Sequence, residues 1–381
     1  MALVVTTTSV AFIQPYVPEY RVPFFTKLQA ELARRDMDLS IHTGPSLRQP
    51  ADARNTPWTF HHSDPFAGIA RDRVRWRLGT SRLTRNIDLV VIEHAVKNLE
   101  SWRLLLGADH TRVAMWGHGA VYSGQTDPVV RTLRSALTRR AGWFFSYTAA
   151  GAEAVSGHGY PRSRTTVVHN ATDTRQLLSD RPPDRTIQNF RTKYSLTAGH
   201  TAIYIGRLEA YKGIPYLLDA ARHAGLLDPY FRLLVAGHGS LTPLVQQATA
   251  AGAPVVHIGS VSGVAKAQAL FASDIAAIPY AIGLVACDAL TAGLPIVSLR
   301  NQGHGPEADY VAELATWLPE DTSPVAYADA LVHDLNSARL ANRQENCRVL
   351  GMTLSVERTV QAFADGLDAW RSSLGAPSAQ A

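Results

Sequence analysis

The sequence predicts an α/β protein of two domains, each with a parallel sheet wrapped by helices. Short apolar runs alternate with amphipathic stretches along most of the chain, which is the pattern of β-α units. The chain has 381 residues, so two domains of roughly 150–200 residues are expected rather than one core. Apolar residues make up 46% and charged residues 18% of the sequence, values typical of globular proteins.

Strand-like runs fall into two successive sets, which indicates two doubly wound domains. In the first half the expected strands are Leu3–Thr7, Asp38–His42, Leu89–Ile92, Val113–Trp116, Trp143–Ser146 and Thr166–His169. In the second half they are Thr201–Ile205, Phe231–Ala236, Val255–Ile258, Ile275–Ile278, Pro295–Ser298 and Leu314–Trp317.

The segment Thr174–His200 interrupts this rhythm and places the domain boundary. We expect an N-terminal domain over 1–175 and a C-terminal domain over 176–354. A final helix over 355–373, with Ser355 as its N-cap, is expected to pack back on the first domain.

Several sequence features bear on the compartment. The apolar start lacks a basic region and a small-residue cleavage site, so it is interpreted as a buried strand rather than a signal peptide. No run of about 18 uncharged apolar residues occurs, so no membrane-spanning helix is expected. Cys287 and Cys347 have no CxxC partner, which favours a reducing compartment and argues against structural zinc. A cytoplasmic location is the prediction.

Positive charge is concentrated in the first half of the chain. Residues 1–175 contain 22 Lys and Arg against 14 Asp and Glu, and much of the excess lies in 71–85 and 131–140. This basic surface is interpreted either as solvated helix faces or as a surface for an anionic membrane or a phosphate-bearing acceptor. Nucleic acid is not expected as a partner, because no recognition-fold signature is present.

The segment 202–213 carries the strongest chemical signal. An apolar run ends at Gly206 and is followed by Arg207 and Lys212. In α/β proteins ligands bind beyond the carboxyl ends of strands, where an Arg fork and a Lys point charge suit a diphosphate. The alternative is a surface turn with two solvated cations.

Three further strand ends carry glycine or a helix start. The run Gly237-His238-Gly239 is a GxG turn that lets a ligand approach the backbone. In 278–297 a helix is expected to begin at Gly283 and end at Gly293, which offers amide groups to a phosphate. The fourth strand end is the glycine loop 301–307.

These motifs, in this order, resemble glycosyltransferase family 4, whose members are retaining, metal-independent enzymes of the GT-B fold. The resemblance covers Gly-Arg-Leu-x3-Lys-Gly, the strand-GxG turn and Gly-Leu-x3-Asp-Ala-x2-Ala-Gly-x-Pro-Ile-Val. In the first half, 14–25 is similar to the family's opening loop and 167–173 to its segment before the linker. The resemblance implies two Rossmann-like domains facing across a cleft and a nucleotide-sugar donor bound to the second.

By this resemblance Arg207 and Lys212 bind the donor diphosphate and stabilise the leaving group. The backbone amides of Leu284 and Val285 cap the phosphates, and Asp288 replaces the second Glu of the E-x7-E motif and holds the ribose. Tyr280 replaces the first Glu, which contacts the donor sugar in relatives, or else packs at the strand end. The other expected donor-binding residues are Gly206, Gly237, His238, Gly239, Val261 and Gly283.

In the first domain, His118 follows a strand where relatives place an active-site histidine, and it is the third catalytic candidate. His94 is the second choice for a sugar contact. Glu19 and Arg21 lie in the first loop and either contact acceptor or sugar or form a loop salt bridge.

No metal or other cofactor is expected. Asp36 and Asp38 have DxD spacing, but they precede a strand and so lie at the edge opposite the ligand side. The predicted activity is retaining transfer of a sugar from a nucleotide-sugar to an acceptor hydroxyl. The alternatives are a degenerate protein that binds nucleotide-sugar without turnover, or an epimerase or phosphorylase on the same fold. A dinucleotide oxidoreductase is disfavoured because GxGxxG is absent.

Overall fold

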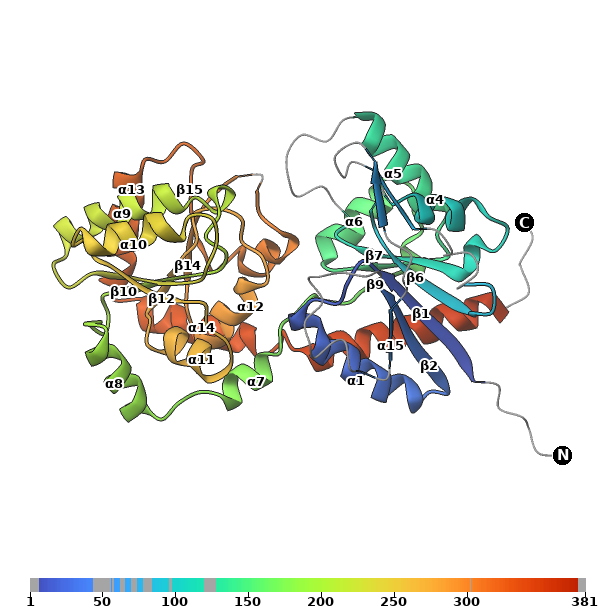
Figure 1. Ribbon diagram of the computed structural model, residues 1–381, viewed down its shortest axis with the longest axis horizontal. Coiled ribbons are helices and arrows are strands. Elements are labelled where there is room, and N and C mark those ends of the chain that lie inside the picture. Colours follow the sequence, from blue (N-terminus) through green and yellow to red (C-terminus); the bar gives the residue numbers. More distant parts are fainter. Residues whose placement is uncertain are drawn as a thin grey trace. The chain divides into compact units, whose positions relative to one another are not determined.

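The chain folds into two compact units in a computed structural model (Figure 1). The structure describes residues 7–43, 56, 58–61, 66–69, 74–77, 84–95, 98–119, 128–301 and 303–375. Unit 1 holds the described residues up to Asn170 together with 356–375, and unit 2 holds 171–355. The chain therefore changes unit between Asn170 and Ala171 and returns to unit 1 at Val356.

Unit 1 is built on a parallel sheet with the strand order β3-β2-β1-β6-β7-β8-β9. A separate antiparallel pair, β4-β5, belongs to the same unit. The strands are β1 (Thr8–Gln14), β2 (Met37–Thr43), β3 (Thr59–His61), β4 (Phe66–Ile69), β5 (Val74–Arg77), β6 (Leu89–Glu93), β7 (Val113–Gly117), β8 (Trp143–Ser146) and β9 (Thr165–Val167).

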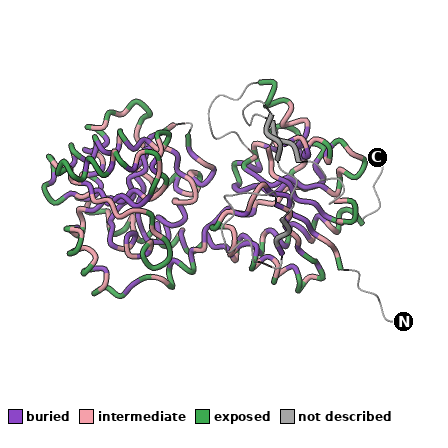
Figure 2. Tube along the Cα trace, viewed as in Figure 1, coloured by how far each residue is buried: buried purple, intermediate pink, exposed green. Residues whose placement is uncertain are grey.

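Helices cover this sheet and include the last helix of the chain. They are η1 (Glu19–Arg21), α1 (Val22–Ala33), α4 (Leu99–Leu106), η2 (His110–Arg112), α5 (Pro128–Arg140), α6 (Ala149–Gly157), η3 (Arg162–Arg164) and α15 (Val356–Gly375). The buried strands form the purple interior in Figure 2.

Helix α15 supplies part of the core of unit 1. Its buried residues Val356, Val360, Phe363, Leu367 and Trp370 recur every three or four positions, so they form one apolar face. The ring of Phe363 stacks on that of Phe145 in β8, with centroids 4.1 Å apart. The return of the chain to unit 1 is therefore stabilised by buried aromatic contacts.

Replacing Phe363 by alanine is expected to destabilise unit 1 by about 3–5 kcal/mol, because a fully buried ring is lost and a cavity remains. Denaturant unfolding followed by fluorescence measures this loss. Leu374→Ala, at an exposed position of the same helix, is the matched control and should change stability little. Equal effects of the two substitutions would contradict the packing described for α15.

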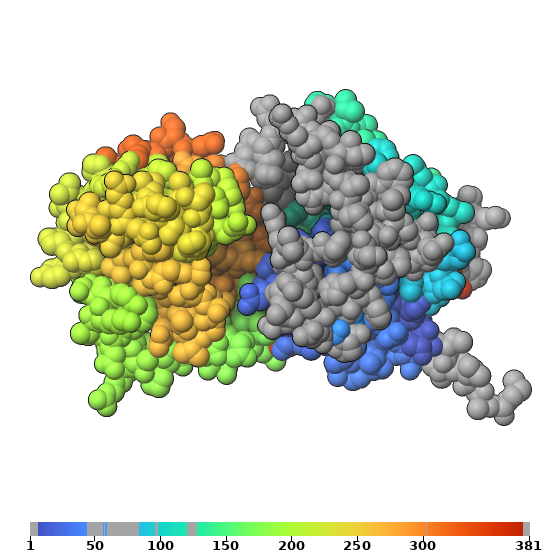
Figure 3. Space-filling view, in the orientation of Figure 1, coloured from blue at the N-terminus to red at the C-terminus, as the bar shows by residue number. Residues whose placement is uncertain are grey.

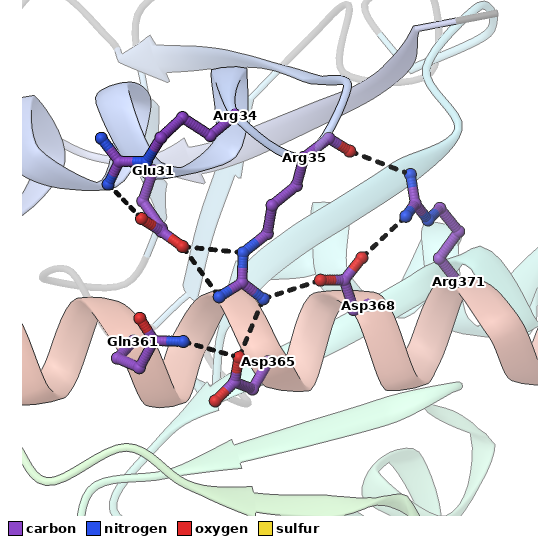
Figure 4. A network of polar contacts seen from close by, with 7 residues as sticks. All are labelled: Glu31, Arg34, Arg35, Gln361, Asp365, Asp368 and Arg371. Atoms are coloured by element: carbon purple, nitrogen blue, oxygen red, sulfur yellow. Dashed lines mark hydrogen bonds and ion pairs between the residues drawn. The ribbon is translucent and has the colours of Figure 1, made fainter. Parts of the chain in front are cut away.

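A polar network fixes the same helix to α1 (Figure 4). Arg35, just past the end of α1, forms ion pairs of 2.8 Å with Asp365 and 2.7 Å with Asp368. It also contacts Glu31 in α1, while Arg371 bonds Asp368 and the backbone oxygen of Arg35. The side chain of Arg35 is only 18% exposed, so these charge-assisted bonds lie partly out of water.

Unit 2 is built on a second parallel sheet with the order β12-β11-β10-β13-β14-β15. The strands are β10 (Thr201–Ile205), β11 (Arg232–Ala236), β12 (Val255–Gly259), β13 (Ile275–Ala277), β14 (Ile296–Leu299) and β15 (Thr316–Leu318).

Helices surround this sheet, and the segment around α10, drawn in yellow, forms much of the surface turned to the viewer in Figure 3. They are α7 (Thr174–Ser179), α8 (Asp184–Lys193), η4 (Ala210–Lys212), α9 (Ile214–Leu227), α10 (Thr242–Ala250), α11 (Gly263–Phe271), α12 (Val285–Ala292), η5 (Pro306–Val311), α13 (Pro324–Leu335) and α14 (Leu340–Gly351). None of the helices in the described part of the chain is both long and apolar enough to cross a membrane.

The first strand differs from its prediction. We expected a strand at Leu3–Thr7, but β1 runs from Thr8 to Gln14, and residues 1–6 lie outside the described part of the chain. Pairing with both β2 and β6 buries Val10–Ile13 and makes this segment a central strand.

Candidate functional site

The candidate site of unit 2 lies at the switch point of its sheet. The chain leaves β10 for β11 and β12 on one side, and it crosses to β13 on the other side of β10. In open parallel sheets this reversal opens a crevice at the carboxyl ends of the two central strands. The loop 206–213 follows β10 and the loop 278–284 follows β13, so both predicted motifs meet at this crevice.

The loops after β10 and β11 are held together through their glycines. A Cβ on Gly237 would lie 1.8 Å from the backbone oxygen of Gly206, and one on Gly239 would lie 2.4 Å from that of Leu208. The Leu208 amide donates to the oxygen of His238 over 3.1 Å. Glycine is therefore required by backbone contact, and the side chain of His238 is left exposed.

The fold holds the side chain of Lys212 in place at this crevice. Its Nζ donates to the backbone oxygen of Ala281, 2.6 Å away, in the loop before α12. Burial lowers the pKa of Lys212, and the nearby carboxylate of Glu307 opposes that shift. The ammonium group thus lies next to the loop that leads into α12.

Arg207 is held far more loosely. Its side chain is 73% exposed, and Glu209 lies 3.8 Å from its guanidinium. Glu209 itself is bonded to the backbone amide and hydroxyl of Ser240. Arg207 is therefore available at the edge of the crevice, with the surface exposure expected of a side chain that closes on a ligand.

Helix α12 presents its first turn to the same crevice. It begins at Val285, two residues later than predicted, and ends at Ala292, where Gly293 caps it in the left-handed conformation with a φ of 77°. The amides of Ala286 and Cys287 bond to the oxygens of Gly283 and Leu284. Within the described chain the amides of Leu284 and Val285 have no protein acceptor, which leaves them for an anion.

Asp288 is buried and already partnered. Its carboxylate accepts from the hydroxyl of Thr172 over 2.9 Å and from Lys266 over 3.2 and 3.1 Å. Neither partner could be predicted from the sequence, because they lie 116 and 22 residues away from Asp288. A ribose hydroxyl that binds this carboxylate would therefore share it with Lys266 and Thr172.

Tyr280 packs against the loop that carries Lys212. A Cβ on Gly213 would lie 2.1 Å from its Cδ2 atom, and its ring meets that of Tyr216 edge to face at 5.7 Å. Gly213 has a φ of 71° and precedes α9. Tyr280 thus packs at the end of β13, as the second of the two alternatives predicted.

The glycine loop 301–307, predicted as the fourth strand end at this edge, supports the site, although none of its residues was assigned a contact. His304 accepts from the amide of Ile282 at Nδ1 over 3.1 Å and donates from Nε2 to the oxygen of Leu299 over 2.7 Å. Burial, followed by the charge of Lys212, lowers the pKa of His304, so the ring stays neutral and keeps both bonds. The loop thereby positions the turn before α12.

Val261 lies apart from these motifs. It is half-buried and lines a hollow with Phe190 and Tyr194 beside α11.

Unit 1 gathers its predicted residues at the carboxyl ends of β1, β6 and β7. Its switch point lies between β1 and β6, and Arg21 and His94 follow these strands. Arg21 lies over the ring of Trp116 at 4.0 Å and donates to the hydroxyl of Tyr147. The alternative of a loop salt bridge with Glu19 is therefore wrong for Arg21, and Glu19 is exposed.

His118 follows β7 and meets the ring of Tyr147 edge to face at 4.9 Å. Partial removal from water, together with the charges of Arg21 and Arg134, lowers its pKa to about 4. The ring is therefore neutral near pH 7 and can act as a hydrogen-bond partner without carrying charge.

His94 is neutral in the folded protein for a related reason. Burial, followed by the charges of Arg134 and His118, lowers its pKa to about 3. Its Nε2 lies 3.0 Å from the hydroxyl of Thr138, which itself donates to the oxygen of Arg134. His94 therefore donates to Thr138 and so holds α5 in place.

Acid should destabilise the folded protein through His94. The unfolded residue binds a proton below about pH 6.5, whereas the folded one does not until near pH 3, so unfolding takes up a proton in between. From pH 7 to pH 5 the free energy of unfolding is expected to fall by about 2 kcal/mol from this residue. Denaturant unfolding of wild type and His94→Gln at pH 7 and pH 5 measures this change. If both proteins lost the same free energy of unfolding between the two pH values, the prediction would be contradicted.

The DxD pair lies at the amino end of its strand, as predicted. Asp36 has a φ of 55° in the turn before β2, and Asp38 is the second residue of that strand. Among the described residues no group of three His, Cys, Asp or Glu is arranged to hold a metal ion.

Comparisons with known proteins agree with this geometry. Residues 199–337 match the family described as Glycosyl transferases group 1. A phosphatidyl-myo-inositol mannosyltransferase of Mycobacterium tuberculosis is 29% identical over 155 residues, which are 38% of this chain and 40% of that protein. The chain thus aligns with less than half the length of the curated relatives it matches.

Solved structures resemble the whole chain. The Anabaena protein HepE in complex with UDP and glucose has a TM-score of 0.67 at 15% identity, covering 95% of this chain and 100% of that one. The sucrose-phosphate synthase of Thermosynechococcus elongatus has a TM-score of 0.68 at 15% identity, with 97% and 100% covered. Residues 199–337 are therefore similar to the glycosyl transferases group 1 family, and the chain has the two-domain GT-B fold predicted from its motifs.

Proposed function

We propose that this protein is a retaining glycosyltransferase that moves a sugar from a nucleotide-sugar donor to an acceptor hydroxyl. The observation that carries the proposal is the arrangement of Lys212 and the first turn of α12 at the switch point of unit 2. A cation and unpaired helix amides together suit the two negative phosphates of a nucleotide-sugar. The match of residues 199–337 to glycosyl transferases and the UDP complexes of HepE support the same donor class.

Each cationic group has a distinct part in this proposal. Lys212 and the amides of Leu284 and Val285 meet the charge that develops on the leaving diphosphate. Arg207 closes on the same phosphates from the exposed edge, and its planar guanidinium group binds two phosphate oxygens at once. The ribose lies at Asp288, whose carboxylate is held in place by the Lys266 ammonium.

We propose that the transfer retains the anomeric configuration. His118 is neutral near pH 7, so we assign it a hydrogen bond to the transferred sugar rather than the role of a charged acid. The departing phosphate takes the proton of the acceptor hydroxyl, and the new bond forms on the face that the diphosphate leaves. Lys212 and Arg207 stabilise the negative charge on the leaving diphosphate, so the reaction needs no nucleophilic side chain of the protein.

The reaction is proposed to need no metal ion, because side-chain cations and helix amides face the diphosphate. Donor turnover by chelator-treated protein is expected to equal that of untreated protein. Adding Mg²⁺ back is the control. A rate that falls at least tenfold with chelator and returns with Mg²⁺ would contradict this part of the proposal.

The basic residues of α5 are proposed to face the acceptor, on an anionic membrane surface or a phosphate-bearing molecule, with the protein in the cytoplasm. Arg131, Arg139 and Arg140 in this helix are exposed. Most of the predicted basic segment 71–85 lies outside the described side chains.

A donor panel tests the proposal without knowledge of the acceptor. UDP-, GDP- and dTDP-sugars are offered in turn, and slow release of sugar is followed over hours. Hydrolysis of at least one donor is expected, because water replaces the missing acceptor. Binding of a donor with no turnover would favour a degenerate protein, and neither binding nor turnover of any donor would overturn the transferase assignment.

A further inference from the structure

A second charged site lies in unit 1, between α5 and α6 (Figure 1). Its cavity has a volume of about 50 Å³. A single water needs roughly 10–15 Å³, so the cavity is large enough for a small oxyanion. The lining contains Arg131, Arg134, Arg139 and His158. No Asp or Glu is among the described residues that line it.

Arg134 lines this cavity and is half-buried. Its Nε atom is fully buried without a hydrogen bond, and the described chain contains no carboxylate in contact with its guanidinium. Burial lowers the pKa of Arg134, which is the effect of removing a charge from water without pairing it. A buried donor left unpaired is destabilising, so the residue is expected to serve a ligand.

The surrounding contacts hold this guanidinium in place. Thr138 donates to the backbone oxygen of Arg134 and is itself fixed by His94. Arg139 donates to the backbone oxygen of His158 over 3.2 Å, which keeps a second cation at the rim. Tyr160 and Val155 are buried and form an apolar wall.

The cavity is next to the residue proposed to face the sugar. Gly119, which directly follows His118, lines it, and the charge of Arg134 is among the causes that lower the pKa of His118. A group bound at Arg134 therefore lies near His118.

We propose that this cavity binds a phosphate monoester carried by the acceptor, with Arg134 as its main ligand and Arg131 and Arg139 at its rim. Three arginines without a carboxylate suit a doubly charged phosphate better than a neutral hydroxyl or a single carboxylate. The assignment to the acceptor rests on the proposed glycosyl transfer, whereas phosphate binding itself does not.

Calorimetric titration of the full chain with inorganic phosphate tests the site. One saturable phosphate site is expected in wild type, weakened about tenfold or more in Arg134→Gln, because one charge-assisted donor pair is lost. Arg134→Lys should recover part of the affinity, since it restores the charge without the fork. Arg162→Gln, which removes an exposed arginine of the same unit outside the cavity, is the matched control and should bind as wild type.

Two arms identify the source of the phosphate. Glycerol phosphate reports a free phosphate monoester, and vesicles of phosphatidylcholine with phosphatidic acid report a lipid headgroup. Binding of either that depends on Arg134 supports the site. Equal binding by Arg134→Gln and Arg162→Gln, with both variants folded by circular dichroism, would overturn it, as would loss of the phosphate site in Lys212→Ala instead.

The donor panel separates failure of this inference from failure of the proposed function. Donor hydrolysis by wild type without Arg134-dependent phosphate binding removes the cavity proposal alone. Arg134-dependent phosphate binding without donor turnover leaves a phosphate site and removes the transferase assignment.

Discussion

Replacing Lys212 by alanine is expected to lower the rate of donor turnover by about 10²–10³-fold, because the leaving diphosphate loses a fixed cation in a partly buried site. The loss should fall mainly on kcat, since the charge that Lys212 meets grows as the bond to the sugar breaks. Steady-state donor hydrolysis, or transfer once an acceptor is known, measures it.

Two further variants show whether the loss of rate is due to the cation at position 212. Lys212→Arg keeps a cation at the site and should recover part of the rate. Arg222→Ala removes an exposed cation of the same unit on α9 and should leave turnover unchanged. A Lys212→Ala protein that is folded and turns over at the wild-type rate would show that the loop after β10 does not act on the diphosphate.

Replacing Gly237 by alanine is expected to destabilise unit 2 by about 3 kcal/mol or more and to abolish donor binding. A Cβ there would lie 1.8 Å from the Gly206 backbone oxygen, so the two glycine loops must move apart. That movement displaces the segment that carries Arg207 and Lys212. Thermal unfolding and calorimetric titration with nucleoside diphosphates measure the two effects.

Gly252 provides the matched control for this substitution. Its φ is 78°, but nothing lies within 4 Å of a Cβ placed there. Gly252→Ala therefore carries backbone strain without a clash and should cost about 1–2 kcal/mol while leaving binding intact. If both variants behaved alike, contact between the glycine loops would not be what requires Gly237.

Much of the fold could be predicted because parallel strands are short, apolar and regularly spaced. The strands Trp143–Ser146 and Thr201–Ile205 have the predicted bounds, and most others differ by one or two residues. The segment 174–200 was predicted only as an interruption, yet it contains α7 and α8. The amphipathic pattern of α8 leaves only Ile187 buried, so the polar sequence gave a weak helix signal.

The residues of the candidate site could be predicted only where they directly follow the end of a strand. Arg207, Lys212 and the start of α12 could be found in this way, because the carboxyl ends of parallel strands share one edge. Lys266 and Thr172 at Asp288, and His304 beneath Ile282, could not, since tertiary packing brings them together across long separations. Arg134 was visible in the sequence as one of several basic residues, and only its burial without a partner sets it apart.

The measurement that tests the central claim most directly is release of sugar from a nucleotide-sugar, followed by the NMR signal of the anomeric proton. We predict that wild type releases sugar from at least one donor, that the first product has the anomeric configuration of the donor, and that Lys212→Ala releases it at least a hundredfold more slowly. Release with inverted configuration would contradict the retaining mechanism, and no release from any UDP-, GDP- or dTDP-sugar would contradict the assignment as a glycosyltransferase.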